Sequence, residues 1–311
     1  MSACCGPERG PAPAESTSGP DAGSDTGSDA PAELLESLAA RAPEDLQMIG
    51  LTGGSFLMGD DGPLAYLQEE APVRETTVDP YALAATTVTV AQFAAFVQAT
   101  GHRTDAEIHG SSLVFSGLVS EQSSGVSPTV AGTPWWLQVA GASWHRPEGP
   151  GSEVLGREDH PVTHVSRRDA EAYAQWVGAR LPSEAEWEFA ARGGLVQQPF
   201  PWGGVREPEG VPRMNTFEGE FPDAPTSPVG TVAVTEFPPN GFGFHNMTGN
   251  VWEWTTGVFS RQDPREVLRG GSYMCHASYC RRYRTSARSA TTADTSLGHT
   301  GFRLAVSTRG R

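Results

Sequence analysis

The chain has 311 residues, of which 38% are hydrophobic, enough to bury the core of one large domain or two modest ones. Its formal charge of −15 disfavours nucleic acids and anionic membranes as partners, and no run of about 18 apolar residues predicts a membrane span. The 36 glycines and 25 prolines favour a loop-rich fold with short elements over a helical bundle.

Residues 1–44 are predicted to form a disordered tail that includes a possible short helix within residues 31–46. The first 31 residues are mostly Gly, Pro, Ser, Ala and Asp, and they bury too little apolar surface to offset the entropy lost on ordering. No charged stretch followed by an apolar one predicts a secretory signal, so we expect a cytoplasmic protein. Cys4 and Cys5 could capture a metal there, although an inert tail is the simpler interpretation.

The folded domain is predicted to begin at about Met48 and to end near residue 308. Residues 46–60 alternate in polarity around Gly53 and Gly54, which predicts a hairpin. A helix is expected to follow, with apolar residues at helical spacing and an end at Gly101; its apolar residues are Val90, Phe93, Phe96 and Val97.

Residues 166–194 predict two further helices. The second begins at Ser183, where Glu186 completes a capping box, and ends at Gly193 and Gly194. One face of the first carries Ala170, Tyr173, Ala174 and Val177. Beyond Gly194 we expect short strands joined by elaborate loops, and therefore a single compact α+β domain with little regular structure.

Two of the four cysteines, Cys275 and Cys280, lie in "GGSYMCHASYCRRYR" (residues 270–284). Positions five apart diverge on a strand and on a helix, so the backbone between them must turn if the sulfurs meet. A zinc site usually needs four ligands, and only His276 is near. Two soft thiolates suit Cu(I), a redox pair usually has the spacing C-x-x-C, and two unconnected core cysteines are equally compatible with the spacing.

Five arginines surround this pair in an otherwise acidic chain: Arg269, Arg281, Arg282, Arg284 and Arg288. Nearby cations lower the pKa of a thiol and favour the thiolate. The arginines could equally form a solvated strip or pair with structural carboxylates. Four cysteines in a chain of this length do not predict a disulfide framework.

The stretch "RGGSYMCHASYCRRYRTSARS" (residues 269–289) closely resembles the signature of the formylglycine-generating enzymes, also called sulfatase-modifying factors. Other stretches are similar to that family in the same order, among them "GGSFLMGD", "ATGHRTDAE", "DHPVTHVS", "ARLPSEAEWEFAARGG", "FPPNGFGFHNMTGNVWEWT" and "HTGFRLA". The resemblance covers residues 48–308 and implies a C-type-lectin-like catalytic domain.

The resemblance implies a copper-dependent oxidase that uses O2 as a co-substrate. Its partner would be an unfolded sulfatase polypeptide with a Cys-x-Pro-x-Arg motif, whose cysteine becomes Cα-formylglycine, and the enzyme would act as a monomer. Cys275 and Cys280 match the two ligands of Cu(I) at the floor of a surface groove. The matching catalytic residues also include Ser272, Tyr279 and Ser112, and the matching substrate-binding residues are Trp135, Trp136, Arg288 and His299.

The family also binds structural calcium. One site is matched by Asn240, Gly241, Gly243 and His245, mostly through carbonyl oxygens that suit a hard cation. A glycine-rich turn without an ion would have the same sequence. Asn215 and Thr216 match the start of a second calcium site, but residues 221–230 are shorter than the usual acidic loop and its carboxylate ligand is not evident.

Two other functions are compatible with such a fold. An iron-dependent sulfoxide synthase of the same superfamily needs an H-x3-H-x-E triad and a second helical domain, and the sequence has neither. A non-catalytic C-type-lectin-like binding domain needs no copper, and the presence of both Cys275 and Cys280 argues against it.

Overall fold

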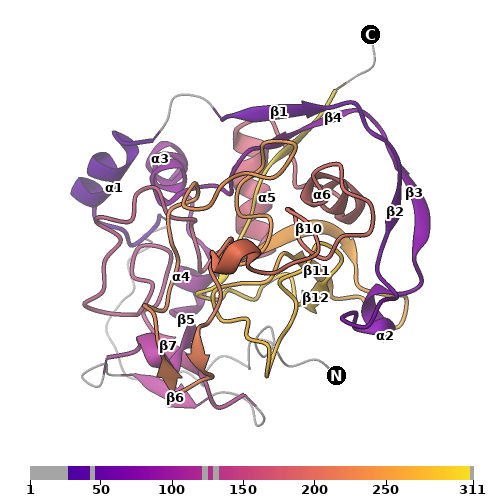
Figure 1. The fold of residues 1–311 in the computed structure, drawn as a ribbon. Coiled ribbons are helices and arrows are strands. Elements are labelled where there is room, and N and C mark those ends of the chain that lie inside the picture. Colours follow the sequence, from indigo (N-terminus) through magenta and orange to yellow (C-terminus); the bar gives the residue numbers. More distant parts are fainter. Residues whose placement is uncertain (1–26, 43–45, 121–124, 129–132, 309–311) are drawn as a thin grey trace.

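The computed structural model describes residues 27–42, 46–120, 125–128 and 133–308 (Figure 1). Its α-helices are α1 (Ala32–Ala39), α2 (Leu67–Glu70), α3 (Val90–Thr100), α4 (Asp105–His109), α5 (Arg167–Trp176) and α6 (Glu184–Ala191). Two short 3-10 helices are η2 (Ser116–Leu118) and η3 (Pro208–Gly210). In the described part of the chain, none of the helices combines the length and the apolar character needed to cross a bilayer.

Local capping signals set the starts of the longer helices. The predicted capping box of Ser183 and Glu186 is present at α6, and the predicted end of α3 at Gly101 is confirmed by a left-handed backbone there, with φ of 68°. Thr89 and Thr104 cap α3 and α4 in the same way as Ser183. These caps satisfy backbone N–H groups that a helix start would otherwise leave unpaired.

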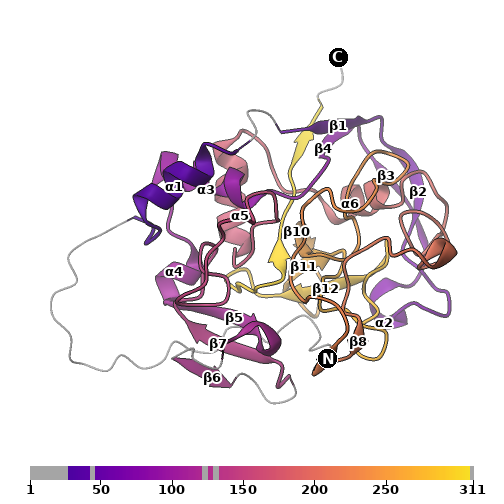
Figure 2. The same cartoon turned by 60° about the vertical axis from the view of Figure 1, so that its left-hand side comes forward.

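The folded unit begins earlier than the predicted boundary at residue 48. Helix α1 lies beside α3 in both views (Figures 1 and 2), and its Leu38 side chain is fully buried in the main core. The short helix expected within residues 31–46 is therefore confirmed as α1, and it is held by tertiary packing and is not disordered. Residues 1–26, including Cys4 and Cys5, lie outside the described residues.

The predicted hairpin within residues 46–60 is wrong. Strand β1 (Met48–Leu51) pairs with β4 (Tyr81–Ala84), while β2 (Gly54–Met58) pairs with β3 (Arg74–Val78), all antiparallel. Gly53 separates β1 from β2 with φ of 67°, and a Cβ there would lie 2.3 Å from the carbonyl oxygen of Val78. The two glycines thus redirect the chain from one sheet to the next and do not close a hairpin.

A four-stranded sheet occupies the middle of the molecule. Its order is β12 (Arg288–Thr291), β11 (Glu266–Arg269), β10 (Trp252–Val258) and β13 (Thr300–Gly301), with only the β10–β13 pair parallel. In both views the β2–β3 ribbon lies to one side of it and a three-stranded sheet to the other (Figures 1 and 2). That sheet has the order β5 (Ser111–Phe115), β7 (Trp136–Ala140) and β6 (Val126–Pro128).

Two smaller pairings complete the sheets: β14 (Ala305–Ser307) pairs with β4, and β8 (Gly219–Glu220) pairs with β9 (Ala224–Pro225). Aromatic side chains fill much of the core between α3, α5 and the central sheet; Phe93 contacts Trp144 and stacks on Tyr173. The predicted single α+β domain with short elements is confirmed.

The core also contains arginines that are buried together with carboxylates. Arg269 donates to Glu188 at 2.6 Å, and Arg303 donates to Glu253 at 2.6 Å. A buried charge is tolerated only when it is paired and hydrogen bonded. These pairs fasten α6 and the last part of the chain to the central sheet, which fixes the frame from which the 270–284 loop extends.

Candidate active site

The loop between β11 and β12 brings the two predicted cysteine ligands together. The sulfur atoms of Cys275 and Cys280 lie 3.5 Å apart, and neither cysteine forms a disulfide. The chain turns between them through two hydrogen bonds to the carbonyl oxygen of His276, from the backbone N–H of Tyr279 at 3.0 Å and of Cys280 at 2.7 Å. The predicted turn is therefore confirmed, and the separation excludes a disulfide, which needs about 2.05 Å.

A glycine and a backbone donor shape the start of this loop. Gly271 has φ of 77°, and a Cβ there would lie 2.7 Å from the carbonyl oxygen of Arg282, so the two arms of the loop meet only with glycine at this position. The backbone N–H of Ser272 donates to the sulfur of Cys275 at 3.4 Å. A donor at this position favours the thiolate over the thiol.

Both cysteine side chains are buried, with 2% and 1% of their surface exposed for Cys275 and Cys280. Tyr279, the residue before Cys280, stacks on Phe221 with ring centroids 4.6 Å apart and meets the ring of Trp135 edge-on at 4.6 Å. The predicted groove floor is thus closed in this conformation, because little sulfur surface reaches solvent.

The arginines around the pair serve mainly as partners of structural carboxylates. Arg282 pairs with Glu69 at 2.6 Å, stacks on Tyr66 at 3.9 Å from the ring centroid, and has one guanidinium nitrogen 4.0 Å from the sulfur of Cys280. Arg284 pairs with the buried Glu70. Through these pairs the segment around α2 is fastened to the loop of residues 270–284, which we call the cysteine loop.

Several predicted site residues lie near one another. The hydroxyl of Ser272 is 3.0 Å from Nδ1 of His299, and the ring of Trp136 meets His299 edge-on at 4.6 Å. Trp136 is fully buried, so this tryptophan is part of the core beside the site. Arg288 does not contact these residues through the bonds described here; it pairs with Glu184 at 2.8 Å and packs over Phe259.

Ser112 belongs to a neighbouring polar group. Its hydroxyl donates to the carbonyl oxygen of Ser296 at 2.9 Å and lies 2.8 Å from Nδ1 of His164. The backbone N–H of Gly298 donates to Leu113 at 2.9 Å, so residues 296–299 link this group to His299. His164 and Ser296 were not predicted as site residues, since neither stands in a spacing that indicates a site. The only local peculiarity is the left-handed backbone of His164, with φ of 58°.

The side chains of the residues predicted to hold calcium are hydrogen bonded within the protein, and the site itself stays a prediction. The amide oxygen of Asn240 accepts hydrogen bonds from the backbone N–H groups of Phe242 at 3.0 Å and Phe244 at 3.1 Å, and its amide nitrogen donates to Ala190. The side chain of Asn240 therefore stabilises the glycine-rich turn itself, as the alternative without an ion expects. Nδ1 of His245 bonds to the carbonyl oxygen of Phe237 at 2.8 Å.

The second predicted calcium pair is also committed to the protein. The amide nitrogen of Asn215 donates to the carbonyl oxygen of Gly230 and to the side chain of Asn250. Thr216 accepts a hydrogen bond from Arg206 at 3.0 Å. Both side chains are therefore held by neighbouring residues, and the second calcium site also stays a prediction.

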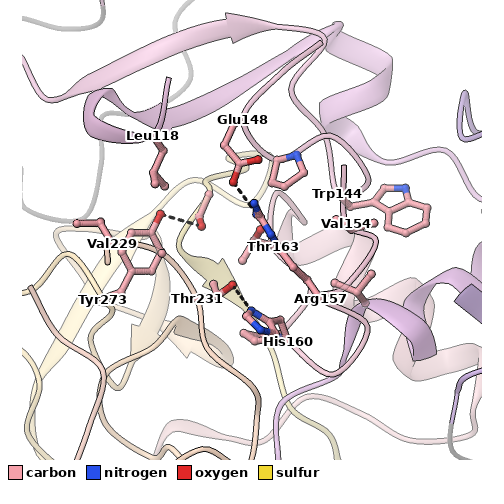
Figure 3. Close-up of a pocket in the computed structure, with 15 residues that line it drawn as sticks. Leu118, Trp144, Glu148, Val154, Arg157, His160, Thr163, Val229, Thr231 and Tyr273 are labelled. Atoms are coloured by element: carbon pink, nitrogen blue, oxygen red, sulfur yellow. Dashed lines mark hydrogen bonds and ion pairs between the residues drawn. The ribbon is translucent and has the colours of Figure 1, made fainter. Parts of the chain in front are cut away.

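A cavity of about 190 Å³ lies beside the cysteine loop (Figure 3). Two of its lining residues, Tyr273 and Gly298, are the sequence neighbours of Ser272 and His299, and the hydroxyl of Tyr273 donates to Gly298 at 3.1 Å. Burial raises the pKa of Tyr273 well above its usual range, so the phenol stays protonated. The opposite wall carries the ion pair of Glu148 and Arg157 at 2.6 Å.

The sulfur pair suits a soft monovalent metal ion. Two sulfurs 3.5 Å apart can each lie about 2.3 Å from one ion, the usual length of a metal–thiolate bond. Thiolates are also the ligands that Cu(I) prefers. Cys275 and Cys280 therefore fit copper by their separation and their chemistry.

Solved structures define the class of fold. PvdO from Pseudomonas aeruginosa matches with a TM-score of 0.56 and 24% sequence identity, over 84% of this chain and 94% of that chain. CarF matches with a TM-score of 0.51 and 22% identity, over 85% and 99%. At these identities the likeness concerns the fold alone.

Sequence relatives define the family. The Sulfatase-modifying factor enzyme 1-like domain matches residues 35–308, and this chain belongs to that family. It is 48% identical over 286 residues to the formylglycine-generating enzyme of Streptomyces coelicolor, covering 86% of this chain and 91% of the relative. The bovine formylglycine-generating enzyme is 46% identical over 278 residues (84% and 74%). A bovine relative named inactive Cα-formylglycine-generating enzyme 2 is 41% identical over 270 residues (84% and 88%).

Proposed function

We propose that this protein oxidises a cysteine of a sulfatase polypeptide to Cα-formylglycine, with O2 as the oxidant and Cu(I) as the cofactor. Identities of 46% and 48% to proteins named formylglycine-generating enzymes support this activity. Because a relative at 41% identity is named inactive, overall similarity does not decide between catalysis and binding. The observation that carries the proposal is the pair of cysteine sulfurs that lie 3.5 Å apart in the 270–284 loop without forming a disulfide.

The balance of the reaction defines what the site must provide. Conversion of a cysteine CH2–SH group to an aldehyde removes two electrons, whereas reduction of O2 to water takes four. A thiol reductant therefore supplies the other two electrons. The proposed steps give a thioaldehyde and two molecules of water, and one water then hydrolyses the thioaldehyde to the aldehyde and H2S. Bound Cu(I) would supply the electron transfer to O2 that amino acid side chains cannot perform.

The protein's own residues would hold and orient the reacting groups. Cys275 and Cys280 hold the metal, and the Ser272 N–H group stabilises the Cys275 thiolate. Arg282, 4.0 Å from the Cys280 sulfur, adds positive charge on the other side of the pair. Burial of the pair excludes water, which strengthens each of these interactions.

We place part of the extended substrate peptide in the cavity that Tyr273 and Gly298 line. These residues adjoin Ser272 and His299 in sequence, so a peptide there is within reach of the cysteine loop. In the motif Cys-x-Pro-x-Arg, the proline pre-orders an extended backbone and lowers the entropy lost on binding. A cavity of about 190 Å³ holds a few side chains and not a folded domain, which agrees with an unfolded substrate.

The test is mass spectrometry of a Cys-x-Pro-x-Arg peptide incubated with the protein, Cu(I), O2 and a thiol reductant. Aldehyde formation lowers the peptide mass by about 18 Da. Cys275→Ala and Cys280→Ala should each abolish the product, while Cys4→Ala/Cys5→Ala, a matched removal of two thiols, should retain it. Full activity of either single variant would refute the proposal.

The same experiment separates catalysis from a binding role. If the protein only binds its target, fluorescence anisotropy will show that the peptide binds, but no aldehyde will form at any copper concentration. Peptides with alanine at the proline or the arginine position test the motif. If the enzyme recognises the motif, each of these two peptides should be turned over much more slowly than the unchanged peptide.

A further inference from the structure

Three segments that are far apart in the sequence meet at a cluster of potential metal ligands. Asp29 precedes α1, Glu107 lies in α4, and His145 lies in the turn that follows β7. One ligand atom from each residue lies within 4.8 Å of the other two. We call this group the carboxylate–histidine cluster; it is separate from the cysteine loop and has no part in the proposed oxidation.

His145 is the observation that points to a ligand. Its side chain is 1% exposed, and its Nε2 atom is buried without a hydrogen-bond partner among the described residues. The nearest acidic atom, Oδ1 of Asp29, lies 3.4 Å from Nε2 but does not meet the geometry of a hydrogen bond. An unsatisfied buried nitrogen costs free energy, which a metal ion bound to its lone pair would recover.

The ring of His145 is held in the orientation that a ligand needs. Its other nitrogen, Nδ1, lies 3.2 Å from the hydroxyl of Ser143, and the turn is closed by backbone hydrogen bonds between Ser143 and Arg146 at 3.1 Å. The ring of Trp144 packs edge-on at 5.3 Å. A histidine that binds metal usually has such a partner on its second nitrogen, which fixes the tautomer with a free lone pair on the first.

Glu107 is oriented by its own helix. One carboxylate oxygen accepts from the backbone N–H and the hydroxyl of Thr104, at 2.7 and 2.6 Å. The other oxygen faces the N-terminal segment, where it accepts from the backbone N–H of Asp29 at 3.1 Å and from the hydroxyl of Ser28. A metal ion would take the place of the Ser28 hydroxyl on this oxygen and leave the capping box intact.

We propose that Asp29, Glu107 and His145 bind one divalent transition-metal ion, with Zn²⁺ the best match. Bonds of about 2.0–2.2 Å from nitrogen and oxygen to zinc place tetrahedral ligands about 3.4 Å apart, which is the separation of Nε2 and Oδ1. Two carboxylates and one neutral imidazole give the set a net negative charge that favours a dication, and Arg146, 3.9 Å from the second carboxylate oxygen of Asp29, offsets part of that charge. The fourth position belongs to water, because the Asp29 side chain is 53% exposed.

The ion would fasten the N-terminal segment to the domain. Asp29 stands three residues before α1, whose Leu38 is buried in the main core, while Glu107 and His145 belong to the elements that flank the β5–β7 pair. A bond from zinc to Asp29 would tie the start of the ordered chain to α4. The site is therefore structural, and its occupancy should raise the temperature of unfolding as the zinc concentration rises.

The test is titration of the metal-free, full-length protein with Zn²⁺ in competition with a chromophoric chelator. The background protein carries Ser in place of all four cysteines, so that thiols cannot bind the zinc. We expect one equivalent of zinc to bind and to raise the unfolding temperature. His145→Gln should weaken binding at least 100-fold. Asp29→Asn changes a half-exposed side chain and should weaken binding at least 10-fold.

A matched control is His102→Gln. His102 also contacts a carboxylate, Asp169 at 2.9 Å, but lies outside the cluster, so its replacement should leave zinc affinity unchanged. Co²⁺ gives a second readout, since tetrahedral binding produces visible absorption bands that both cluster variants should lose. Absence of zinc binding by the background protein would overturn the proposal, as would an affinity of Asp29→Asn equal to that of the background protein.

Discussion

The cysteine loop and the carboxylate–histidine cluster offer metals opposite kinds of ligand. The loop provides two sulfurs 3.5 Å apart, which are soft donors that favour monovalent copper. The cluster provides one imidazole nitrogen and two carboxylates, which are harder donors that favour zinc. Donor chemistry alone should therefore sort two metals between two sites in one small domain.

The two regions also differ in how they are held. Buried ion pairs surround the cysteine loop: Arg282 with Glu69, and Arg284 with Glu70. The cluster instead depends on the half-exposed Asp29, from the first segment that the structure describes. The comparison shows that the loop is preorganised before a metal arrives, whereas a metal in the cluster would complete its assembly.

The largest expected effect is a loss of copper without a loss of zinc. In Cys280→Ser, Cu(I) affinity should fall by more than about 100-fold, since even the loss of a partner that only orients a metal ligand costs about 10–100-fold. Zinc bound at the cluster should stay within twofold of its wild-type affinity. Separate competition titrations with a copper(I) chelator and a zinc chelator measure both. A parallel loss of both metals would show that the two regions are not independent.

The next effect concerns the preorganised frame of the loop. Glu70→Ala leaves the buried guanidinium of Arg284 without its closest partner and should cost about 3 kcal/mol of the free energy of unfolding. Asp60, 3.2 Å from the same guanidinium, limits the loss. The control is Glu171→Ala, whose pair with Arg167 involves a carboxylate that is 51% exposed and should cost less than about 0.5 kcal/mol. Urea unfolding measures both, and equal losses would contradict the difference.

How much of each region the sequence predicts depends on how far apart in the sequence the interacting residues are. The cap of α6 by Ser183 and Glu186 lies within four residues. Strand and helix periods predict a turn between Cys275 and Cys280 only if their sulfurs meet, and the family resemblance implied that they do. Both are local, so both were predictable. The supposed hairpin around Gly53 was not, because β4 and β3, which lie further along the chain, supply the partners of β1 and β2.

The carboxylate–histidine cluster has no sequence signal at all. Residues 29, 107 and 145 stand in no common motif, and Glu107 alone predicts only a helix cap. The first calcium site stays a prediction for a different reason: a glycine-rich turn has the same sequence whether or not its carbonyl oxygens bind an ion, and the side chain of Asn240 accepts from the backbone N–H groups of the turn.

A smaller effect separates the capping role of Thr104 from its role beside the proposed metal. Thr104→Ala should cost about 1 kcal/mol of stability, as the loss of a helix cap does, and lower zinc affinity about 10-fold because Glu107 loses its orientation. Thr89→Ala removes the equivalent cap of α3 and is the matched control. It should cost a similar amount of stability and leave zinc affinity unchanged. Equal zinc affinities in the two variants would remove Glu107 from the ligand set.

The smallest effect is the pH dependence contributed by the cavity beside the cysteine loop. Burial lowers the pKa of His160 below its usual value of about 6.5, with Asp159 opposing and Arg157 reinforcing the shift. The unfolded chain therefore takes up this proton more readily than the folded one, so stability present above pH 6.5 is lost as the pH falls below it. His160→Asn should unfold in urea with a weaker decline in stability between pH 7 and pH 5 than the wild type. The control replaces the exposed His109 by Asn, which should leave that decline unchanged. If His160→Asn also shows the wild-type decline, the protonation of His160 does not differ between the folded and the unfolded chain.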